Sequence, residues 1–181
     1  MRLRYPDYRY FKKPMAILVP CTESEYDAYL AAAIPAYAAD KVASGQWSQD
    51  EALVLSRQSF EGLLPQGPAT PDHYLFTIRD AADRAVGMIW LGTQDRAGQR
   101  IGFIYDVSIQ PTHQRQGHAT RAFTALEDIA RPLGLSGIAL HVFGHNPGAQ
   151  ALYAKLGYQI TNLNMFKPLS PPARDSWLPC R

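Results

Sequence analysis

The sequence has few cysteines and little net charge, and both features narrow the class of protein. The two cysteines, Cys21 and Cys180, stand near opposite ends of the 181 residues, with no CxxC pair and no histidines at zinc-binding spacing. We therefore expect neither a structural disulfide nor a metal site. The formal net charge is +2, from 18 Lys and Arg against 16 Asp and Glu. Because nucleic-acid binding depends on a surplus of basic residues, a nucleic-acid partner is disfavoured.

Long hydrophobic runs are also missing. No apolar stretch approaches the roughly 20 residues that span a bilayer, and the N-terminus lacks the charged-then-apolar pattern of a signal peptide. We therefore expect no membrane partner and a soluble, cytoplasmic protein. The chain is long enough for one sizeable core but not for two. This predicts a single domain over residues 14–168, preceded by an arm (1–13) and followed by a tail (169–181).

Helical and alternating apolar patterns succeed one another in a definite order. The expected elements are a strand at 15–19, a helix from Thr22, a helix from Ser48 to Phe60, a hairpin over 73–78 and 86–91, a strand at 101–109, a helix from Gly117 to 130, a strand at 137–143, a helix from Asn146 to 157 and a strand at 158–166. This β-α-α-β-β-β-α-β-α-β order predicts a mixed α/β fold.

Local signals set several of these boundaries. Thr22 with Glu25, and Ser48 with Glu51, have the spacing of capping boxes at helix starts. Pro35 lacks an N–H and crowds the preceding turn, so it predicts a kink or break and leaves open one helix or two short ones. The polar stretch 92–100 is expected to be a loop.

The segment at 114–119, QRQGHA, joins the strand at 101–109 to a helix. The first N–H groups of a helix have no intrahelical acceptors, so a helix that starts directly after a strand can bind an anion at its N-terminus. Gly117 permits close backbone approach or positive φ, Ala119 keeps the next position small, and Arg115 adds positive charge. Taken alone, the pattern fits an ordinary strand-to-helix loop equally well.

A second block of motifs favours the phosphate-binding interpretation. Residues 104–111 read IYDVSIQP ahead of QRQGHA, and the later block has Asn146, Ala149, ALY at 151–153 and LGY at 156–158. Together they resemble the acyl-CoA-binding core of the GCN5-related N-acetyltransferase (GNAT) superfamily, with Tyr158 where Phe is common. The resemblance spans about residues 101–165, and the earlier elements agree in order and length.

The resemblance implies a mostly antiparallel sheet that splays between its fourth and fifth strands, and acetyl-CoA as cosubstrate. In the family, unpaired backbone of the fourth strand meets the pantetheine arm, and an N–H there can stabilise the oxyanion. The following turn binds the pyrophosphate. The implied cofactor-binding residues are Val107, Ser108, Ile109, Arg115, Gln116, Gly117, His118, Ala119, Thr120, Asn146 and Tyr153. Asn146 before Pro147 is also a suitable N-cap.

The resemblance also implies proton-transfer roles. Tyr153 matches the family's general acid, although a tyrosine at this helical spacing also fits a core position. Several relatives carry a Glu on the fifth strand where this chain has His141, which faces away from Leu140 and Val142. A histidine is a plausible base at neutral pH. Asp106 is the competing candidate, and Tyr105, His145 or water remain alternatives.

The function implied is transfer of an acetyl group from acetyl-CoA to a primary amine, on a small molecule or a protein. The alternative is a GNAT-fold module that binds acyl-CoA without turnover. The acceptor side is the helical segment after the first strand, whose aromatic residues either contact the amine or belong to the core: Tyr26, Tyr29, Tyr37 and Trp47. The sequence leaves open whether the protein is a homodimer.

Overall fold

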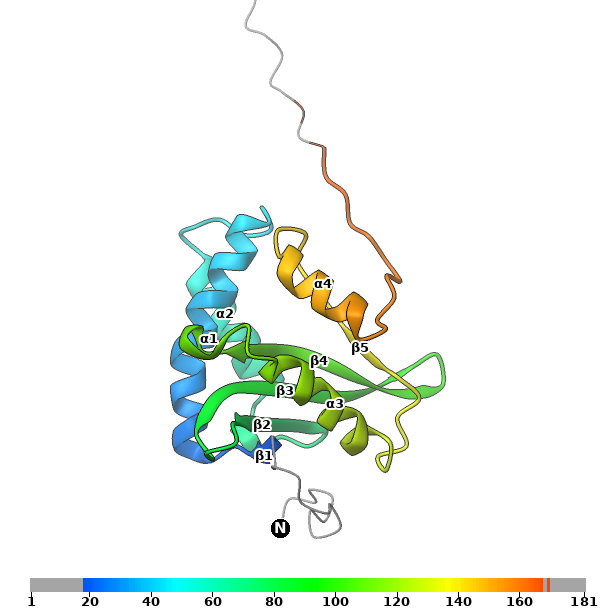
Figure 1. The fold of residues 1–181 in the computed structure, drawn as a ribbon. Coiled ribbons are helices and arrows are strands. Elements are labelled where there is room, and N and C mark those ends of the chain that lie inside the picture. The colour runs from blue at the N-terminus through cyan, green and yellow to red at the C-terminus, as the bar shows by residue number, and fades with distance from the viewer. Residues whose placement is uncertain (1–17, 168, 170–181) are drawn as a thin grey trace, which may run out of the picture.

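The computed structural model describes residues 18–167 and 169, which form one sheet flanked by helices (Figure 1). The helices are α1 (Glu23–Ala43), α2 (Ala52–Leu63), α3 (His118–Ala130) and α4 (Pro147–Lys155), with short 3-10 helices at Gly67–Ala69 and Pro111–His113. The strands are β1 (Leu18–Pro20), β2 (His73–Arg79), β3 (Ala85–Arg96), β4 (Gln99–Ile109) and β5 (Ile138–Leu140).

The sheet has the strand order β1-β2-β3-β4-β5. The first four strands pair antiparallel, whereas β5 pairs parallel to β4 after the chain crosses over through α3. A parallel pair requires such a crossover, and a helix is the usual one. The mixed α/β fold expected from the order of elements is therefore confirmed.

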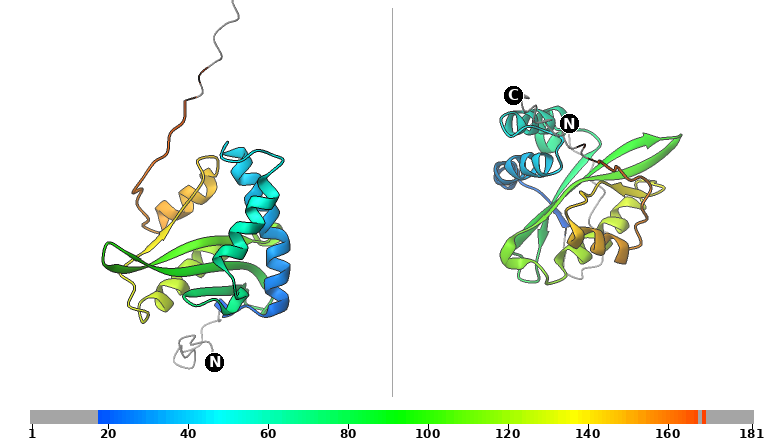
Figure 2. Two further views of the ribbon diagram at one scale, coloured as in Figure 1. Left: turned by 180° about the vertical axis from the view of Figure 1, so that it is seen from behind. Right: turned by 90° about the horizontal axis from the view of Figure 1, so that it is seen from above.

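Helices cover both faces of the sheet, as the view from above shows (Figure 2). On one face, α1 and α2 pack through Tyr29, Ile34 and Phe60 against Leu75 and Trp90 of the sheet. On the other face, α3 and α4 cover a second apolar cluster. This arrangement places one helical layer on each side of the strand ends where the predicted site lies.

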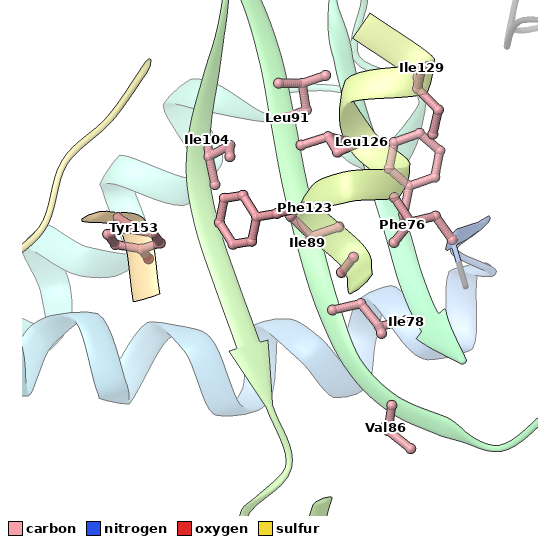
Figure 3. Packing of buried hydrophobic residues seen from close by; sticks show 12 residues of the cluster. Phe76, Ile78, Val86, Ile89, Leu91, Ile104, Phe123, Leu126, Ile129 and Tyr153 are labelled. Atoms are coloured by element: carbon pink, nitrogen blue, oxygen red, sulfur yellow. The ribbon is translucent and has the colours of Figure 1, made fainter. Parts of the chain in front are cut away.

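The second cluster is the larger core (Figure 3). Phe123 and Leu126 of α3 lie over Ile89 and Leu91 of β3, and all four side chains are fully or almost fully buried. Their spacing along α3 is the helical periodicity read from the sequence. Burying each of these side chains stabilises the fold by roughly 1.5–3 kcal/mol, which fixes α3, and with it the preceding turn, on the sheet.

Helix α1 begins at the predicted capping box and runs unbroken through Pro35. The Glu25 N–H donates to the Thr22 hydroxyl, and the Thr22 N–H donates to the Glu25 carboxylate, over 3.3 and 2.9 Å. Of the two alternatives at Pro35, the single helix is correct. Pro35 and Ala31, whose carbonyl loses the Pro35 donor, both lie on the exposed face, so water can satisfy that carbonyl.

Two other predicted boundaries are wrong. Helix α2 begins at Ala52 rather than near Ser48, and its N-cap Glu51 makes no side-chain capping bond, because the Ser48 hydroxyl donates to the Glu51 carboxylate instead. The stretch 92–100 is not a loop. Strands β3 and β4 continue through it and turn at Ala97 and Gly98, whose φ angles are both positive (50° and 76°), as a tight hairpin turn requires.

The end of the chain departs most from expectation. Residues 158–166, predicted to form the last strand, make no strand in the structure and pair with none of its five strands. Strand β5 is also shorter than predicted, at Ile138–Leu140. The predicted arm, residues 15–17 of the first strand, Cys180 and nearly all of the tail lie outside the described residues.

Candidate active site

The turn between β4 and α3 has the conformation that the sequence predicts. Gly117 is the N-cap of α3 and is left-handed, with φ 78° and ψ 8°, and no side chain caps the helix. The first N–H groups of α3 therefore have neither an intrahelical acceptor nor a side-chain acceptor. Arg115 is exposed and also has positive φ, at 61°. The turn thus offers backbone donors and a nearby positive charge, which suits a phosphate group.

Two glutamine side chains stabilise this turn. The amide of Gln114 donates to the Ile109 carbonyl over 3.0 Å, and the amide of Gln116 donates to the Thr112 carbonyl over 3.1 Å. Because both amides bond within the turn, their side chains keep its shape while the backbone N–H groups stay accessible.

Arg121 is a further part of this site that sequence reasoning missed. Its guanidinium donates to the Gln116 carbonyl over 3.2 Å and to Nδ1 of His118 over 3.0 Å. His118 is buried, and burial together with the charge of Arg121 lowers the pKa of its imidazole. His118 therefore supports the turn as a neutral ring. The available signal was the spacing, since position 121 lies one helical turn after Gly117.

Strands β4 and β5 separate immediately before this turn. They pair only between Gly102–Ile104 and Ile138–Leu140. Beyond Ile104 the edge of β4 that faces β5 is unpaired, while residues 107–109 keep their pairing with β3 on the other edge. The backbone groups of this stretch that face away from β3 therefore have no strand partner, although the Ile109 carbonyl accepts from the Gln114 amide. This is the splay that the family resemblance implied.

A β-bulge accompanies the separation. Asp106 pairs with Trp90 and Ile104 pairs with Leu91, so Tyr105 is an extra residue in β4. A bulge re-aims the side chains beside it. Tyr105 stacks on Trp90, with ring centroids 4.7 Å apart, on the face covered by α1 and α2. The Trp90 indole N–H in turn donates to Nδ1 of His73 over 2.9 Å.

Asp106 lies beside the bulge on the same face. Desolvation of its carboxyl raises its pKa, and this effect is opposed by the Tyr29 hydroxyl and the Val107 N–H. The Tyr29 hydroxyl is buried without a hydrogen bond of good geometry, so it acts on Asp106 mainly as a nearby dipole. A carboxylate of raised pKa is a stronger proton acceptor than an exposed one, which suits a general base.

Tyr153 comes from α4 and points into the larger core (Figure 3). Its ring contacts those of Phe123 and Tyr158, with centroids 5.5 and 5.8 Å away. Burial, and then the charge of Asp106, raise the pKa of its hydroxyl, so the group stays protonated at neutral pH. Tyr153 is thus a core residue with a protonated hydroxyl. Asn146 caps α4, accepting the Ala149 N–H over 3.0 Å.

His141 is exposed and directly follows β5. Leu140 and Val142 pack on the larger core, so alternation places His141 and Phe143 on the opposite face, toward α1. The rings of His141 and Phe143 meet edge to face at 5.1 Å. His141 and Asp106 are therefore presented on the same face of the separating strands.

Aromatic rings and a lysine connect this face to α1. The ammonium of Lys41 lies 5.3 to 5.9 Å from the ring centroids of Tyr37, Trp47 and Phe143. Imidazole Nε2 of His145 donates to the Asp40 carboxylate over 3.0 Å. Both contacts join the end of α1 to the loop between β5 and α4. Of the four predicted acceptor-side aromatics, Tyr29 belongs to the core, whereas Tyr26, Tyr37 and Trp47 remain partly exposed.

Comparison with known proteins identifies the family. Residues 39–158 match the acetyltransferase (GNAT) family, and the chain belongs to it. The uncharacterized N-acetyltransferase YycN of Bacillus subtilis (strain 168) is 36% identical over 153 residues, which are 84% of this chain and 98% of YycN. The crystal structure of YycN superposes with a TM-score of 0.81 over 85% of this chain and 98% of that chain. The uncharacterized N-acetyltransferase YdgE of the same strain is 34% identical over 148 residues, 82% of this chain and 94% of YdgE.

The protein is therefore a GNAT N-acetyltransferase, and membership of the family implies acetyl-CoA as its cosubstrate. The enzyme interpretation is confirmed over that of a non-catalytic module. Within residues 18–167, no helix is long and apolar enough to cross a membrane. In the same part of the chain, no three His, Cys, Asp or Glu side chains gather as metal ligands would.

Proposed function

We propose that the protein transfers the acetyl group of acetyl-CoA to a primary amine by direct attack of the amine on the thioester. The observation that carries the proposal is the separation of β4 from β5 directly ahead of the uncapped N-terminus of α3. One gap between strands can hold the pantetheine arm, while the adjoining helix N-terminus binds the pyrophosphate. The thioester then lies between the two helical layers.

The residues present fit this cosubstrate on its phosphate side. A Cβ at position 117 would come within 3.0 Å of the Arg121 guanidinium, so glycine favours the left-handed conformation here and leaves this side of the turn open. The N–H groups of residues 117–120 can donate to phosphate oxygens, and Arg115 adds charge at the rim. Unpaired groups of residues 107–109 can bond the pantetheine amides, and an N–H there can donate to the thioester oxygen.

The amine enters from the face of α1 and α2. Acetyl-CoA supplies an activated acyl group. As the amine nitrogen bonds to the carbonyl carbon, the carbon–sulfur bond breaks, the nitrogen loses a proton and the sulfur gains one. The side chains facing this approach are the carboxylate of Asp106, the imidazole of His141 and the rings of Tyr105 and Phe143. Aromatic rings and a carboxylate favour a cationic amine over a neutral or anionic substrate.

We assign the proton acceptor to His141, directly or through water, and the proton donor to Tyr153. Asp106 is the competing base; its raised pKa and its electrostatic effect on Tyr153 support this alternative. Removing the amine proton is the harder step. An alkyl amine of pKa about 10.4 is neutral in fewer than about one molecule in a thousand at pH 7, whereas a thiolate of pKa about 8.5 leaves with little help.

The pH dependence of kcat/KM tests these roles. We expect His141→Ala to lower kcat/KM near neutrality more than Tyr153→Phe does, within the roughly 10²- to 10⁴-fold range of acid–base catalysis. The ascending limb of the kcat/KM profile, which reports deprotonation of the base, should be lost in His141→Ala and kept in Tyr153→Phe. The substrate is the best amine from a panel screened by thiol release from acetyl-CoA.

Asp106→Asn is the matched variant for the competing assignment. If the limb disappears in Asp106→Asn and persists in a folded His141→Ala protein, Asp106 is the base. If it persists in both, water serves that role. Acetyl-CoA affinity, measured for every variant, separates loss of chemistry from loss of binding. Failure of the whole amine panel to release thiol would contradict transfer to a primary amine.

A further inference from the structure

Two aromatic rings of β4 lie beside the groups that face the amine. Tyr105 and Phe103 stand two residues apart on the face covered by α1 and α2, and their ring centroids are 5.0 Å apart, edge to face. Both side chains are partly exposed. Tyr105 directly precedes Asp106 at the bulge, so the pair of rings begins next to that carboxylate and extends away from it along β4.

The sheet beside Phe103 carries little side-chain bulk. Phe103 pairs with Gly92 of β3 on one side and with Ala139 of β5 on the other. Paired residues on neighbouring strands point to the same face, so the Phe103 ring stands between a missing and a small side chain. The Gly92 side is already filled, because a Cβ built there would lie 2.5 Å from the Tyr105 ring. The Ala139 side is therefore where a second ring can lie against Phe103.

The helices on this face pack on other strands. Beneath α1 and α2, the buried strand side chains come from β2 and β3: Leu75, Met88 and Trp90. Ala139 of β5 is partly exposed and lies outside both apolar clusters of the described residues. His141 follows two residues later and faces the same side. An apolar group resting on Ala139 would therefore have the proposed base two residues further along the chain.

The charges on this face suit one ammonium group. The Asp106 carboxyl lies beside the buried Tyr29 hydroxyl, which has no well-aligned hydrogen-bond partner among the described residues. An ammonium bound there can donate to both oxygens. At the end of α1, Asp40 already accepts from His145, and the next residue is the cationic Lys41. A second cationic group on the ligand would meet Lys41, so the body of the amine should be uncharged.

We propose that the acceptor is an arylalkyl primary amine, whose ring lies over Ala139 against Phe103 and whose nitrogen lies at Asp106. The inference rests on the proposed acetyl transfer and adds the class of substrate to it. Two residues of strand span roughly 6.6 Å, a distance that a ring joined to its nitrogen through two carbons covers. The amine nitrogen bonds to the acetyl carbon and loses one proton, and the released sulfur of CoA gains one, which yields an N-acetyl arylalkylamine and free CoA.

Three amines test the substrate class by thiol release from acetyl-CoA. They are 2-phenylethylamine, 2-cyclohexylethylamine, which has a saturated ring of similar size, and n-propylamine, which is too short to reach Phe103. We expect kcat/KM to be highest for 2-phenylethylamine, by roughly 2- to 10-fold over the cyclohexyl compound, because contact between aromatic rings adds to the burial of apolar area. A cyclohexyl compound or n-propylamine used as well as 2-phenylethylamine would overturn the proposal.

Two variants locate the ring. Ala139→Leu fills the proposed place of the ring and should lower kcat/KM for 2-phenylethylamine by roughly tenfold or more. Phe103→Ala should lower it by roughly 2- to 10-fold. Both should leave n-propylamine unchanged. Phe166→Ala is the matched control, since it makes the same replacement at a ring that is 90% exposed after α4, and it should change none of the three amines.

Binding without turnover separates this inference from the proposed reaction. Calorimetric titration of 2-phenylethylamine into the protein saturated with CoA forms a complex that cannot react. The amine should bind, and Ala139→Leu should weaken its binding by roughly tenfold or more while CoA affinity stays the same. Absence of thiol release from every amine, with this binding intact, would contradict the transfer alone. Absence of binding, or an equal loss for all three amines in both variants, would overturn the aromatic site.

Discussion

At the scale of single residues, the cofactor turn depends on one backbone conformation. Gly117 is left-handed, and the space where a Cβ would stand is bounded by Arg121. Gly134, after α3, has nearly the same φ, 71°, but nothing within 4 Å of a Cβ built on it. The two glycines therefore share their backbone strain and differ in their surroundings, which makes them a matched pair.

We expect Gly117→Val to lose the thermal stabilisation that acetyl-CoA gives the wild type. At 100 times Kd a ligand stabilises the native state by about 2.7 kcal/mol, enough for a shift of several degrees in Tm. Both Gly117→Val and Gly134→Val should lower the free energy of unfolding of the free protein by about 1–2 kcal/mol of left-handed strain, and its Tm with it. Differential scanning fluorimetry should show the acetyl-CoA shift retained only in Gly134→Val. A retained shift in folded Gly117→Val would place the pyrophosphate elsewhere.

Asp106 illustrates a residue held at a cost to stability. Desolvation raises the pKa of its carboxyl, so the folded state binds this proton more tightly than the unfolded chain does. The sign follows from linkage. Stability falls as pH rises through the unfolded-state value of about 3.9 toward the higher folded-state pKa, and the penalty is complete above that pKa.

We therefore expect Asp106→Asn to raise the free energy of unfolding at pH 7, because the neutral amide carries no desolvated charge. The gain should vanish near pH 3, where the wild-type carboxyl is protonated in both states. Urea denaturation at the two pH values measures the difference. The exposed Asp95→Asn is the control and should change stability at neither pH. A lower stability of Asp106→Asn at pH 7 would mean that the hydrogen bonds of Asp106 outweigh its desolvation.

At the scale of elements, α1 and α2 share one polar contact within their apolar interface. The hydroxyl of Ser56, fully buried in α2, donates to the Ile34 carbonyl over 2.7 Å, next to Pro35. Residues that precede proline tend to leave the helical region, and this bond opposes that tendency. Ser59 of the same helix also donates to a carbonyl, but to Leu55 within α2, over 2.8 Å.

We expect Ser56→Ala to lower the free energy of unfolding by about 1 kcal/mol, the net value of one buried hydrogen bond. Ser59→Ala should be neutral or slightly stabilising, because alanine is the better helix former and no contact between helices is lost. Chemical denaturation of both variants makes the comparison. Equal effects would show that the contact between α1 and α2 contributes nothing beyond helix propensity.

The elements also show which signals a sequence carries. The capping box of α1, the N-cap of α4 and the left-handed Gly117 were predictable because each is specified by residues within one turn. The turn of the β3–β4 hairpin was not predictable, because Ala97 adopts positive φ, which alanine rarely does. Arg121, the Asp40–His145 bond and the rings around Lys41 were missed for a different reason. The partners of Asp40 and Lys41 are distant in sequence, and the contacts of Arg121 depend on the folded shape of the turn before α3.

At the scale of the whole molecule, fold class and family followed from the order of elements and two motif blocks, since both are local properties in sequence. The last strand could not be judged this way. Residues 158–166 have the composition of a strand, but a strand forms only where another strand pairs with it. The choice between His141 and Asp106 also lies beyond the sequence, because it depends on burial around each group and on the approach of an amine.

The short pairing between β4 and β5 has a consequence for how the molecule assembles and opens. Strands β2, β3 and β4 are neighbours in sequence joined by hairpins, so their contacts form at little cost in loop entropy. Strand β5 joins through only Gly102–Ile104, after α3 has crossed the sheet. A strand pairing that forms late in folding and has few hydrogen bonds is expected to open first in the native state. A cosubstrate bound between β4 and β5 would therefore bridge the weakest pairing of the sheet. It would tie β5 and α4 to strands β2, β3 and β4 while it positions the thioester.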